Sequence, residues 1–302
     1  MKMYKYFVTS ICLFFSLSLL SETTLIILGS GTPNPNPERY GSSYAVVVDD
    51  KAYIVDFGPG SVRRMAAMSK TWGGEFEQLE LQNISIAFLT HIHSDHSAGL
   101  SDLILTPWVM GRSTELELFG PPGLQKMAEH ITKAYEDDIN YRLYGSQPAN
   151  NKGYISKVEE IENDGSIYKD KNVEVIAFKN DHGDFENSFG FLFITKDKRI
   201  LFSGDTGLSD NLMNYGENLD ILVHEVYSSE TFKNKTDDWQ IYHNAHHTSS
   251  IDLGIIANKL KPKKLVLSHI LFWGATEESL LDDVKSNFDG NAIIAKDLMV
   301  IR

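Results

Sequence analysis

Three histidines and one aspartate fall within one short segment, residues 91–96. His91 and His93 are two residues apart, so an extended backbone can direct both side chains toward the same metal ion. Asp95 and His96 follow where the chain turns, and they can face a second metal beside the first. Imidazole and carboxylate together suit zinc, and less exclusively iron or manganese. The segment therefore predicts a metal site.

The elements around this segment are of the kind that position such a site. Residues 84–90 form an apolar, β-prone run, and a helix is predicted from Ser97 to about Leu105. The alternative is a coincidental histidine cluster on a solvated loop. The strand, loop and helix agree with the ligand spacing, so we favour the metal site over this alternative.

Other residues of ligand type come where predicted strands end. Side chains at strand ends converge on one edge of a sheet, which is the geometry that a buried metal pair needs. Each such residue taken alone is more often a cap or a turn residue. The set is more informative, because it supplies the remaining ligand types. Its members are Asp56, His182, Asp205 and His269.

Strands and helices alternate along the chain, which indicates one layered α/β domain. A polar, turn-rich stretch at residues 145–153 is too short to link two domains. Hairpins are predicted at 44–56 and 189–202, helices at 61–70, 123–137, 249–259 and 277–286, and further strands at 24–28, 116–119, 173–178, 219–223, 264–267 and near 292 and 299.

The first 21 residues are typical of a secretory signal peptide. Lys2 and Lys5 precede an apolar run, residues 7–20, that is too short for a comfortable membrane span. The alternatives are an uncleaved anchor or a buried first strand. We expect cleavage after Ser21, an exported domain of residues 22–302 in the periplasm or outside the cell, and no stable membrane span after cleavage.

Cysteine usage and charge narrow the chemistry further. The single cysteine, Cys12, lies in the predicted signal peptide, so disulfides and thiolate ligands are excluded from the mature domain. The formal net charge is −13, and an acidic surface repels phosphate backbones. We therefore expect a small anionic ester as substrate and no nucleic acid.

The 91–96 segment and the strand-end residues together resemble the metallo-β-lactamase superfamily over essentially all of residues 22–302. The resemblance implies a four-layer αββα fold, with two facing mixed sheets covered by helices, and a two-zinc site. It implies that His91, His93 and His182 bind the first metal, that Asp95, His96 and His269 bind the second, that Asp205 bridges both, and that Asp56 orients a ligand histidine.

Two further segments resemble a motif pair of tRNase Z and its relatives: His224-Glu225 and residues 242–248. There a histidine assists the leaving group and a glutamate orients it, and His247 and Glu225 match these two. His224 would support the site without binding metal. From the residues alone, the alternatives are a helix entry capped by Thr248 or Ser249, and a strand-end ion pair.

Spacing along the chain indicates the branch of the superfamily. tRNase Z carries a long arm for tRNA between the third ligand histidine and the bridging aspartate, whereas only 22 residues, 183–204, separate His182 from Asp205. With the predicted signal peptide and the acidic charge, this favours the zinc-dependent arylsulfatases, which residues 28–33, 60–64, 102–112 and 222–227 resemble. A bridging aspartate disfavours β-lactam substrates.

We therefore expect an exported dinuclear-zinc hydrolase that acts on sulfate esters, with a metal-bridging hydroxide as nucleophile. Asp95, His247 and Glu225 would take part in catalysis, and Trp108 and Trp273 would line a leaving-group pocket or lie in the core. The alternatives are a tRNase Z-like phosphodiesterase or endoribonuclease and a non-enzymatic metal-binding accessory protein. The resemblance also implies a homodimer.

Overall fold

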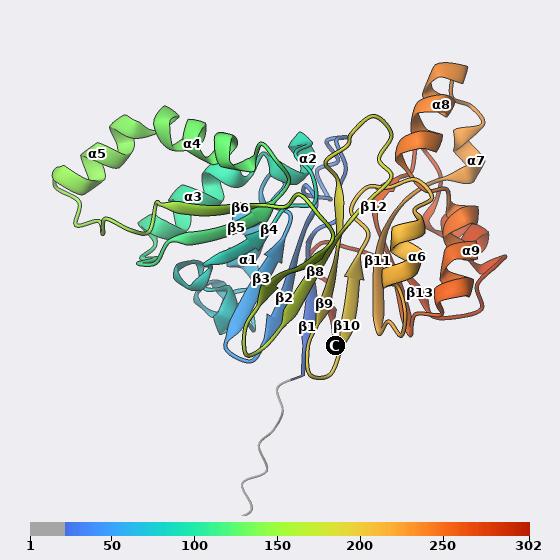
Figure 1. Cartoon of the computed structure of the whole chain (residues 1–302), viewed down its shortest axis with the longest axis horizontal. Helices are drawn as coiled ribbons and strands as arrows, with labels where there is room; N and C mark the ends of the chain where they lie inside the picture. The colour runs from blue at the N-terminus through green and yellow to red at the C-terminus, as the bar shows by residue number, and fades with distance from the viewer. Residues whose placement is uncertain (1–21) are drawn as a thin grey trace, which may run out of the picture.

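The computed structural model describes residues 22–302, so the predicted signal peptide and Cys12 lie outside the described residues. In the described part, two seven-stranded sheets face each other and helices cover both outer faces (Figure 1). The predicted four-layer αββα fold is confirmed. The boundary after residue 21, export and the homodimer stay predictions.

The first sheet is built from the N-terminal half of the domain and one C-terminal strand, β14. Its inner strands are almost continuously apolar because both faces of the sheet are covered, one by the other sheet and one by helices. Pairing is antiparallel from β14 to β3 and parallel from β3 to β6. The order is β14 (Val300–Ile301), β1 (Thr24–Gly29), β2 (Ser43–Val48), β3 (Lys51–Val55), β4 (Ile86–Phe88), β5 (Leu116–Gly120) and β6 (Ser156–Glu160).

The second sheet holds the C-terminal half. Pairing is parallel from β13 to β10 and antiparallel from β10 to β7. The order is β13 (Ala292–Ile294), β12 (Lys264–Leu271), β11 (Ile221–Tyr227), β10 (Arg199–Phe202), β9 (Phe189–Ile194), β8 (Glu174–Lys179) and β7 (Gly165–Lys169).

Helices flank the two sheets on opposite sides of the molecule, with α5 at one extreme and α8 rising from the other half (Figure 1). In the described residues, no helix has the length and apolar character that crossing a membrane requires. The first sheet carries α1 (Ser61–Met68), α2 (Ser94–Ser97), α3 (Leu100–Val109), α4 (Leu124–Ala134) and α5 (Glu136–Tyr144), and the second carries α6 (Asp210–Tyr215), α7 (Ser229–Phe232), α8 (Asp237–His246), α9 (Ser250–Leu260) and α10 (Glu277–Lys285).

Three apolar layers hold these elements together. One lies between the sheets, where Phe88 packs edge-to-face against Phe191 and Phe193. A second lies under α1 and α3, around Met65 and Leu103, and a third lies under α9 and α10. The site residues come from loops, from the short helix α2 and from the strands β11 and β12 at one end of this sandwich.

The structure differs from the predicted elements in several places, and β6, β7, α6 and α7 lie where no element was predicted. The helix predicted over residues 123–137 breaks at Tyr135 into α4 and α5. The strand predicted over 264–267 continues to Leu271. Helix α8 was not predicted, because its aromatic and histidine residues lack an aliphatic helical pattern.

Candidate metal centre

The 91–96 segment runs from the loop after β4 into the short helix α2, so the predicted order of strand, loop and helix is present, but the helix begins three residues before the predicted Ser97. Its first ligand-type residue, His91, is fully buried, and the short helix α2 begins at Ser94 and carries Asp95 and His96. The tight turn from β4 into α2 therefore places both halves of the segment at the same end of the sandwich.

Four donor groups form a first cluster. The Nε2 atom of His91 lies 3.0 Å from Nδ1 of His93, which lies 3.4 Å from Nε2 of His182. The Oδ2 atom of Asp205 lies 3.8 Å from Nε2 of His91. Donor atoms of these four residues lie within 4.8 Å of one another, close enough to hold one metal ion.

Asp95, His96 and His269 form a second cluster beside the first. The Nε2 atom of His269 lies 2.9 Å from Oδ2 of Asp95. The other carboxylate oxygen of Asp205, Oδ1, lies 3.5 Å from Nε2 of His96 and 3.5 Å from Nδ1 of His269. Asp205 therefore lies between the clusters and offers one oxygen to each.

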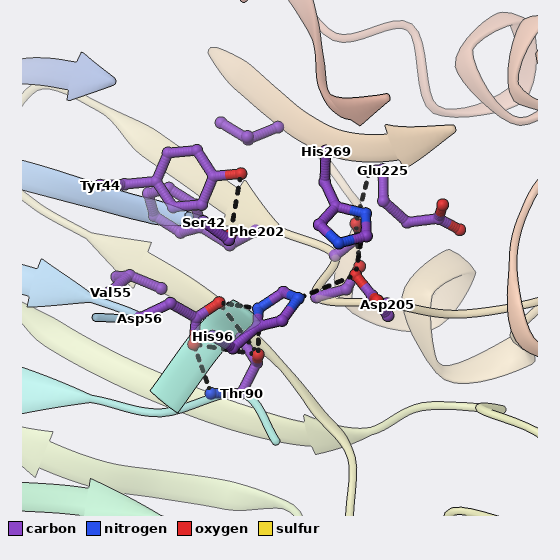
Figure 2. Close-up of a pocket in the computed structure, with 13 residues that line it drawn as sticks. Ser42, Tyr44, Val55, Asp56, Thr90, His96, Phe202, Asp205, Glu225 and His269 are labelled. Carbon is purple, nitrogen blue, oxygen red and sulfur yellow. Dashed lines mark hydrogen bonds and ion pairs between the residues drawn. The ribbon is translucent and has the colours of Figure 1, made fainter. Parts of the chain in front are cut away.

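The second cluster contains polar atoms that the protein itself leaves unsatisfied. Among the described residues, Nε2 of His96, Oδ1 of Asp205 and Nδ1 of His269 are buried without a hydrogen-bond partner. Their side chains line a cavity of about 10 Å³ (Figure 2). Leaving buried polar atoms unpaired is costly, and a cation would satisfy all three. Imidazole nitrogens and carboxylate oxygens are a donor set that zinc accepts, so the residues fit metal ions.

The imidazoles of the first cluster are held in the neutral, metal-binding form. Burial lowers the pKa of His91 well below its usual value and the pKa of His182 to about 4. Burial also lowers the pKa of His93. A lone pair is therefore available on each ring at neutral pH.

The second cluster has more carboxylates facing its imidazoles than the first, because Asp95 and Asp205 both lie beside His96 and His269. Burial disfavours the protonated ring of His96, but the carboxylates of Asp205 and Asp95 outweigh burial and raise its pKa well above the usual value. Burial alone would raise the pKa of Asp205, but His269 and His96 hold that pKa well below its usual value. The bridging carboxylate is therefore ionised.

Residues outside the clusters fix the orientation of the ligand-type histidines. Asp56 accepts hydrogen bonds from the backbone N–H of Thr90, at 2.8 Å, and from Nδ1 of His96, at 2.7 Å. The hydroxyl of Thr90 lies 3.0 Å from Nδ1 of His91. The structure thus brings Asp56 to a ligand-type histidine, the position that the sequence predicts. Thr90 was missed, although it lies next to His91 in the sequence.

His269 reaches the site from inside a strand. Strands β11 and β12 pair His224 with Leu267 and then Val226 with Ile270, so Glu225 faces two residues of β12. This bulge contains His269, whose φ is +45°. A bulge redirects a side chain without ending the strand. The predicted strand end at residue 267 is therefore wrong, although the residue is correctly brought to the site.

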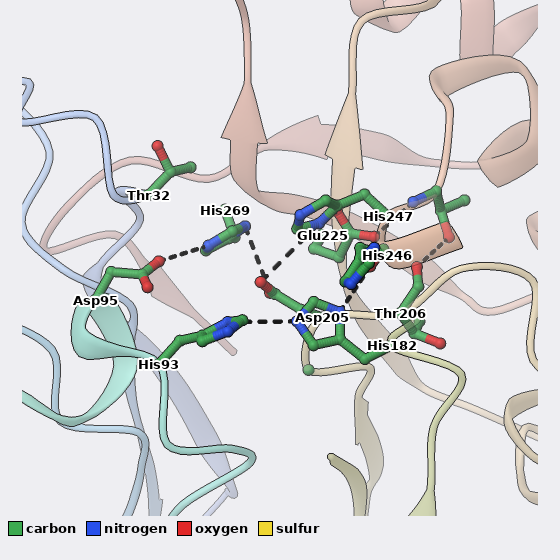
Figure 3. A network of polar contacts seen from close by, with 12 residues as sticks. Thr32, His93, Asp95, His182, Asp205, Thr206, Glu225, His246, His247 and His269 are labelled. Carbon is green, nitrogen blue, oxygen red and sulfur yellow. Dashed lines mark hydrogen bonds and ion pairs between the residues drawn. The ribbon is translucent and has the colours of Figure 1, made fainter. Parts of the chain in front are cut away.

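His247 and Glu225 lie together at the edge of the clusters (Figure 3). The Nδ1 atom of His247 lies 3.3 Å from Oε2 of Glu225 and 4.0 Å from Oδ2 of Asp205. Burial lowers the pKa of His247 to about 4 and, with the nearby Asp205, raises the pKa of Glu225 well above its usual value. The helix-cap alternative holds beside this pairing, since Ser249 caps α9.

His224 and Trp108 make contacts away from the two clusters, whereas Trp273 lies near them. The Nδ1 atom of His224 lies 2.6 Å from the backbone carbonyl oxygen of Glu225, so this ring is tied to its own strand. Trp108 belongs to α3, where its side chain is buried and donates from Nε1 to the carbonyl of Asn150. Of its two predicted roles, Trp108 has the core role and does not line the pocket. Trp273 does line the pocket.

A pocket of about 360 Å³ opens over the clusters. It is lined by His93, Asp95, Asp205 and His269 at its base, and by α8 and the loop after β12 at its sides. The sequence analysis missed its other aromatic residues. Their signal was present, because Trp239, Tyr242 and His243 recur at the three- and four-residue spacing of one helix face.

Comparison with known proteins gives the family. The sequence profile described as "Metallo-beta-lactamase superfamily" matches residues 36–269. Ribonuclease Z of Mycobacterium bovis (strain BCG / Pasteur 1173P2) is 28% identical over 283 residues, which cover 91% of this chain and 96% of the relative.

Two solved structures have the same fold. The metallo-beta-lactamase fold protein YhfI from Bacillus subtilis is 18% identical with a TM-score of 0.69, covering 93% of this chain and 100% of that one. The short form of human tRNase Z is 21% identical with a TM-score of 0.68, and the match covers 92% of this chain and 98% of that one.

These findings correct two expectations. The relatives are named ribonuclease Z, so the expectation of an arylsulfatase is wrong, and so is the exclusion of nucleic acid. The short spacing between His182 and Asp205 shows only that no long insertion lies there, and it says nothing of the ester that is cut. The net charge sums over the whole chain and does not report the charge of one pocket, where bound metal ions would be the largest local charges.

Three findings indicate the same family: the two clusters of histidine and aspartate, their position at one end of an αββα sandwich, and the profile match over residues 36–269. The chain belongs to the metallo-β-lactamase superfamily, in its tRNase Z-like branch, and is a metal-dependent hydrolase.

Proposed function

We propose that this protein is a phosphodiesterase that cleaves RNA, the activity for which its ribonuclease Z relatives are named. One observation carries the proposal. The Asp205 carboxylate lies between two clusters of metal-ligand type, and the His247–Glu225 pair stands beside it, 4.0 Å away. A metal pair with an adjacent proton donor suits displacement at phosphorus, where attacking and leaving oxygens both need stabilisation.

The residues that would hold the metals are those the sequence analysis named. His91, His93 and His182 would hold the first ion, and Asp95, His96 and His269 the second, with Asp205 shared. Bound zinc supplies a water of lowered pKa and stabilises charge on the phosphoryl oxygens. Manganese or iron would be accepted by the same donor atoms.

The His247–Glu225 pair would supply the proton. Glu225 is fixed, since its Oε1 atom accepts the backbone N–H of Thr248 at 2.6 Å. Burial favours the neutral form of both side chains, so the pair tends to hold a proton on Glu225 and leaves His247 uncharged. With Nδ1 of His247 accepting from protonated Glu225, the Nε2–H would give its proton to the leaving oxygen while Glu225 gives its own proton to Nδ1, so that His247 ends neutral and Glu225 ends as a carboxylate.

Asp95 has a positioning contact besides its place in the second cluster. Its Oδ2 atom accepts a hydrogen bond from Nε2 of His269, which connects the 91–96 loop of the first half to β12 of the second half. The two halves of the sandwich are thereby joined at the point where a phosphodiester would bind.

The test is a hydrolysis panel on zinc-loaded protein. The substrates are a precursor tRNA with a 3′ extension, a short single-stranded RNA, bis(p-nitrophenyl) phosphate and p-nitrophenyl sulfate. We expect cleavage of the RNA substrates and of bis(p-nitrophenyl) phosphate. The Asp205→Asn variant should lose both activities. Asp50→Asn, a change at an exposed aspartate in the β2–β3 turn, should leave the rates unchanged. Failure on every phosphodiester with both metals bound, or preference for the sulfate, contradicts the proposal.

A further inference from the structure

Four aromatic side chains form one side of the pocket above the clusters. We call them the aromatic wall: Trp239, Tyr242 and His243 of α8, and Trp273 of the loop after β12. None of them is a metal-ligand candidate, and the mechanism proposed above does not use them. Their arrangement calls for a separate explanation.

The rings form a continuous line from solvent to the metal clusters. Trp239 stacks on His243, with ring centres 5.5 Å apart and planes 21° apart, and His243 lies 4.5 Å from Trp273. Farther in, the ring of His247 lies 5.6 Å from His243 and 6.1 Å from His269. The wall thus leads directly to the proposed proton donor.

Several features of the wall are poorly explained by packing alone. Trp239 leaves 54% of its surface exposed. His243 is buried, yet its Nδ1 atom has no partner among the described residues. Trp273 has a φ of +47°, a conformation that is unfavourable for a bulky residue and that recurs at functional sites.

A positive charge lies at the rim of the same pocket. The Nζ atom of Lys235 is 4.2 Å from the ring centre of Trp273, in a cation–π contact. Lys235 lines the pocket, in a chain whose net charge is −13. An aromatic surface with one cation suits a ligand that is both flat and anionic.

We propose that the aromatic wall binds the nucleobase on the leaving-group side of the scissile phosphate, with Lys235 near its backbone charge. This rests on the proposed phosphodiesterase function. The leaving-group side is assigned from His247, because its ring lies between the wall and the clusters and would face the leaving oxygen in the proposed mechanism. The ligand group is assigned as a nucleobase because aromatic rings stack on the flat face of any base. The pocket volume of about 360 Å³ is suited to one such unit.

The first test measures binding without turnover. Calorimetry on zinc-loaded protein compares adenosine 5′-monophosphate with ribose 5-phosphate, which share a phosphate and differ by the base. We expect the nucleotide to bind roughly 5- to 150-fold more tightly, the range that base–aromatic stacking gives. Trp239→Ala and Trp273→Ala should remove most of this difference, Trp239→Phe should retain much of it, and Trp72→Ala, at an exposed tryptophan elsewhere, should retain all of it. Equal affinities in the wild type overturn the proposal.

The second test assigns the side. A dinucleoside monophosphate is compared with two analogues, one lacking the base on the leaving side and one lacking it on the retained side. We expect Trp239→Ala to lower kcat/KM for substrates with a leaving-side base and to leave the leaving-side abasic analogue unaffected. An equal loss on all three, or a loss tied to the retained base, overturns the proposal. Base-dependent binding with no hydrolysis of any phosphodiester would contradict only the proposed function.

Discussion

The Nδ1 atom of His182 lies 2.8 Å from the carbonyl oxygen of His246, the last residue of α8. The C-terminal end of that helix therefore orients a ligand-type histidine of the first cluster. A carbonyl acceptor at Nδ1 leaves Nε2 as the atom for metal binding. Because α8 also carries most of the aromatic wall, the helix connects the proposed base-binding surface with the metal site.

The first prediction concerns Gly183, which follows His182. Its φ is +54°, and a Cβ added there would lie 2.1 Å from the His246 ring. In Gly183→Ala we expect α8 to be displaced and the hydrogen bond between His182 and His246 to be lost. Zinc affinity should fall by about 10- to 100-fold, as for loss of a residue that orients a ligand. Competition with a chromophoric chelator measures it.

Gly73→Ala is the matched control for this change. Gly73 also has a positive φ, +91°, but a Cβ added there would have no described atom within 4 Å. Both variants should lose about 1 kcal/mol of stability from backbone strain. Only Gly183→Ala should lose zinc affinity, and equal affinities in the two variants would contradict the role of the His246 contact.

The second prediction concerns Asp56→Asn. Asp56 accepts two hydrogen bonds from Thr90 and one from His96, and all three residues are buried. An amide keeps the volume but removes the charge that supports the imidazole of His96. We expect the affinity for one of the two zinc ions to fall by about 10- to 100-fold. Metal analysis after dialysis against a series of chelator concentrations gives the two affinities, and two unchanged affinities would count against this role.

The third prediction concerns the leaving group. In His247→Ala the proton donor is removed, so the loss of rate should be greatest for aryl phosphodiesters whose leaving phenol has a high pKa. A plot of log kcat/KM against leaving-group pKa should therefore be steeper than in the wild type. His130→Ala, at an exposed histidine of α4, is the control. An equal loss for every leaving group would show that His247 positions the substrate and does not donate a proton.

Much of the site could be predicted because its chemistry is local in sequence. Residues 91–96 bring donors to both clusters from one short segment, and Asp56, His182 and Asp205 follow strands of the two sheets that end near the same site. His269 was placed correctly for a reason that was partly wrong, since a bulge and not a strand end directs its side chain. A bulge depends on the partner strand, which the sequence of β12 alone does not show.

What could not be predicted depends on contacts between distant segments. The sequence does not reveal that the carbonyl of His246 reaches His182, 64 positions earlier. It also offers no way to separate Trp108, which packs in the core, from Trp273, which lines the pocket. The substrate class was wrong because a missing insertion and a net charge are properties of the whole chain, whereas specificity depends on a few pocket residues.

The fourth prediction concerns Arg112, whose side chain is fully buried. Its guanidinium donates to the carbonyls of Ile84, Leu103, Ile104 and Gly153. Burial lowers its pKa to about 10, so the group remains charged. Arg112→Lys loses the planar fork and leaves carbonyls unpaired, which should cost roughly 2–4 kcal/mol. Urea unfolding measures this, and Arg63→Lys, at an exposed arginine, should stay within about 0.5 kcal/mol of the wild type.

The fifth prediction concerns Asp170, which joins the two sheets far from the metal centre. Its Oδ2 atom accepts from Lys51, Tyr53 and Tyr168, and its Oδ1 atom accepts two backbone N–H groups. Burial would raise the pKa of Asp170, but these donors outweigh burial and hold it well below 3.8. The charged carboxylate therefore stabilises the folded state above about pH 4, and this contribution is lost as the pH falls below that value.

Asp170→Asn should accordingly lower the free energy of unfolding at pH 7, and the difference from the wild type should shrink as the pH falls below about 4. Urea unfolding of chelator-treated protein at pH 7, 5, 4 and 3 measures the difference without a metal contribution. Asp50→Asn is the control, because Asp50 forms an exposed ion pair with Lys171 in the same region of the fold and should contribute little at any pH. A difference for Asp170→Asn that stays constant across the series would show that its hydrogen bonds, and not its charge, join the sheets.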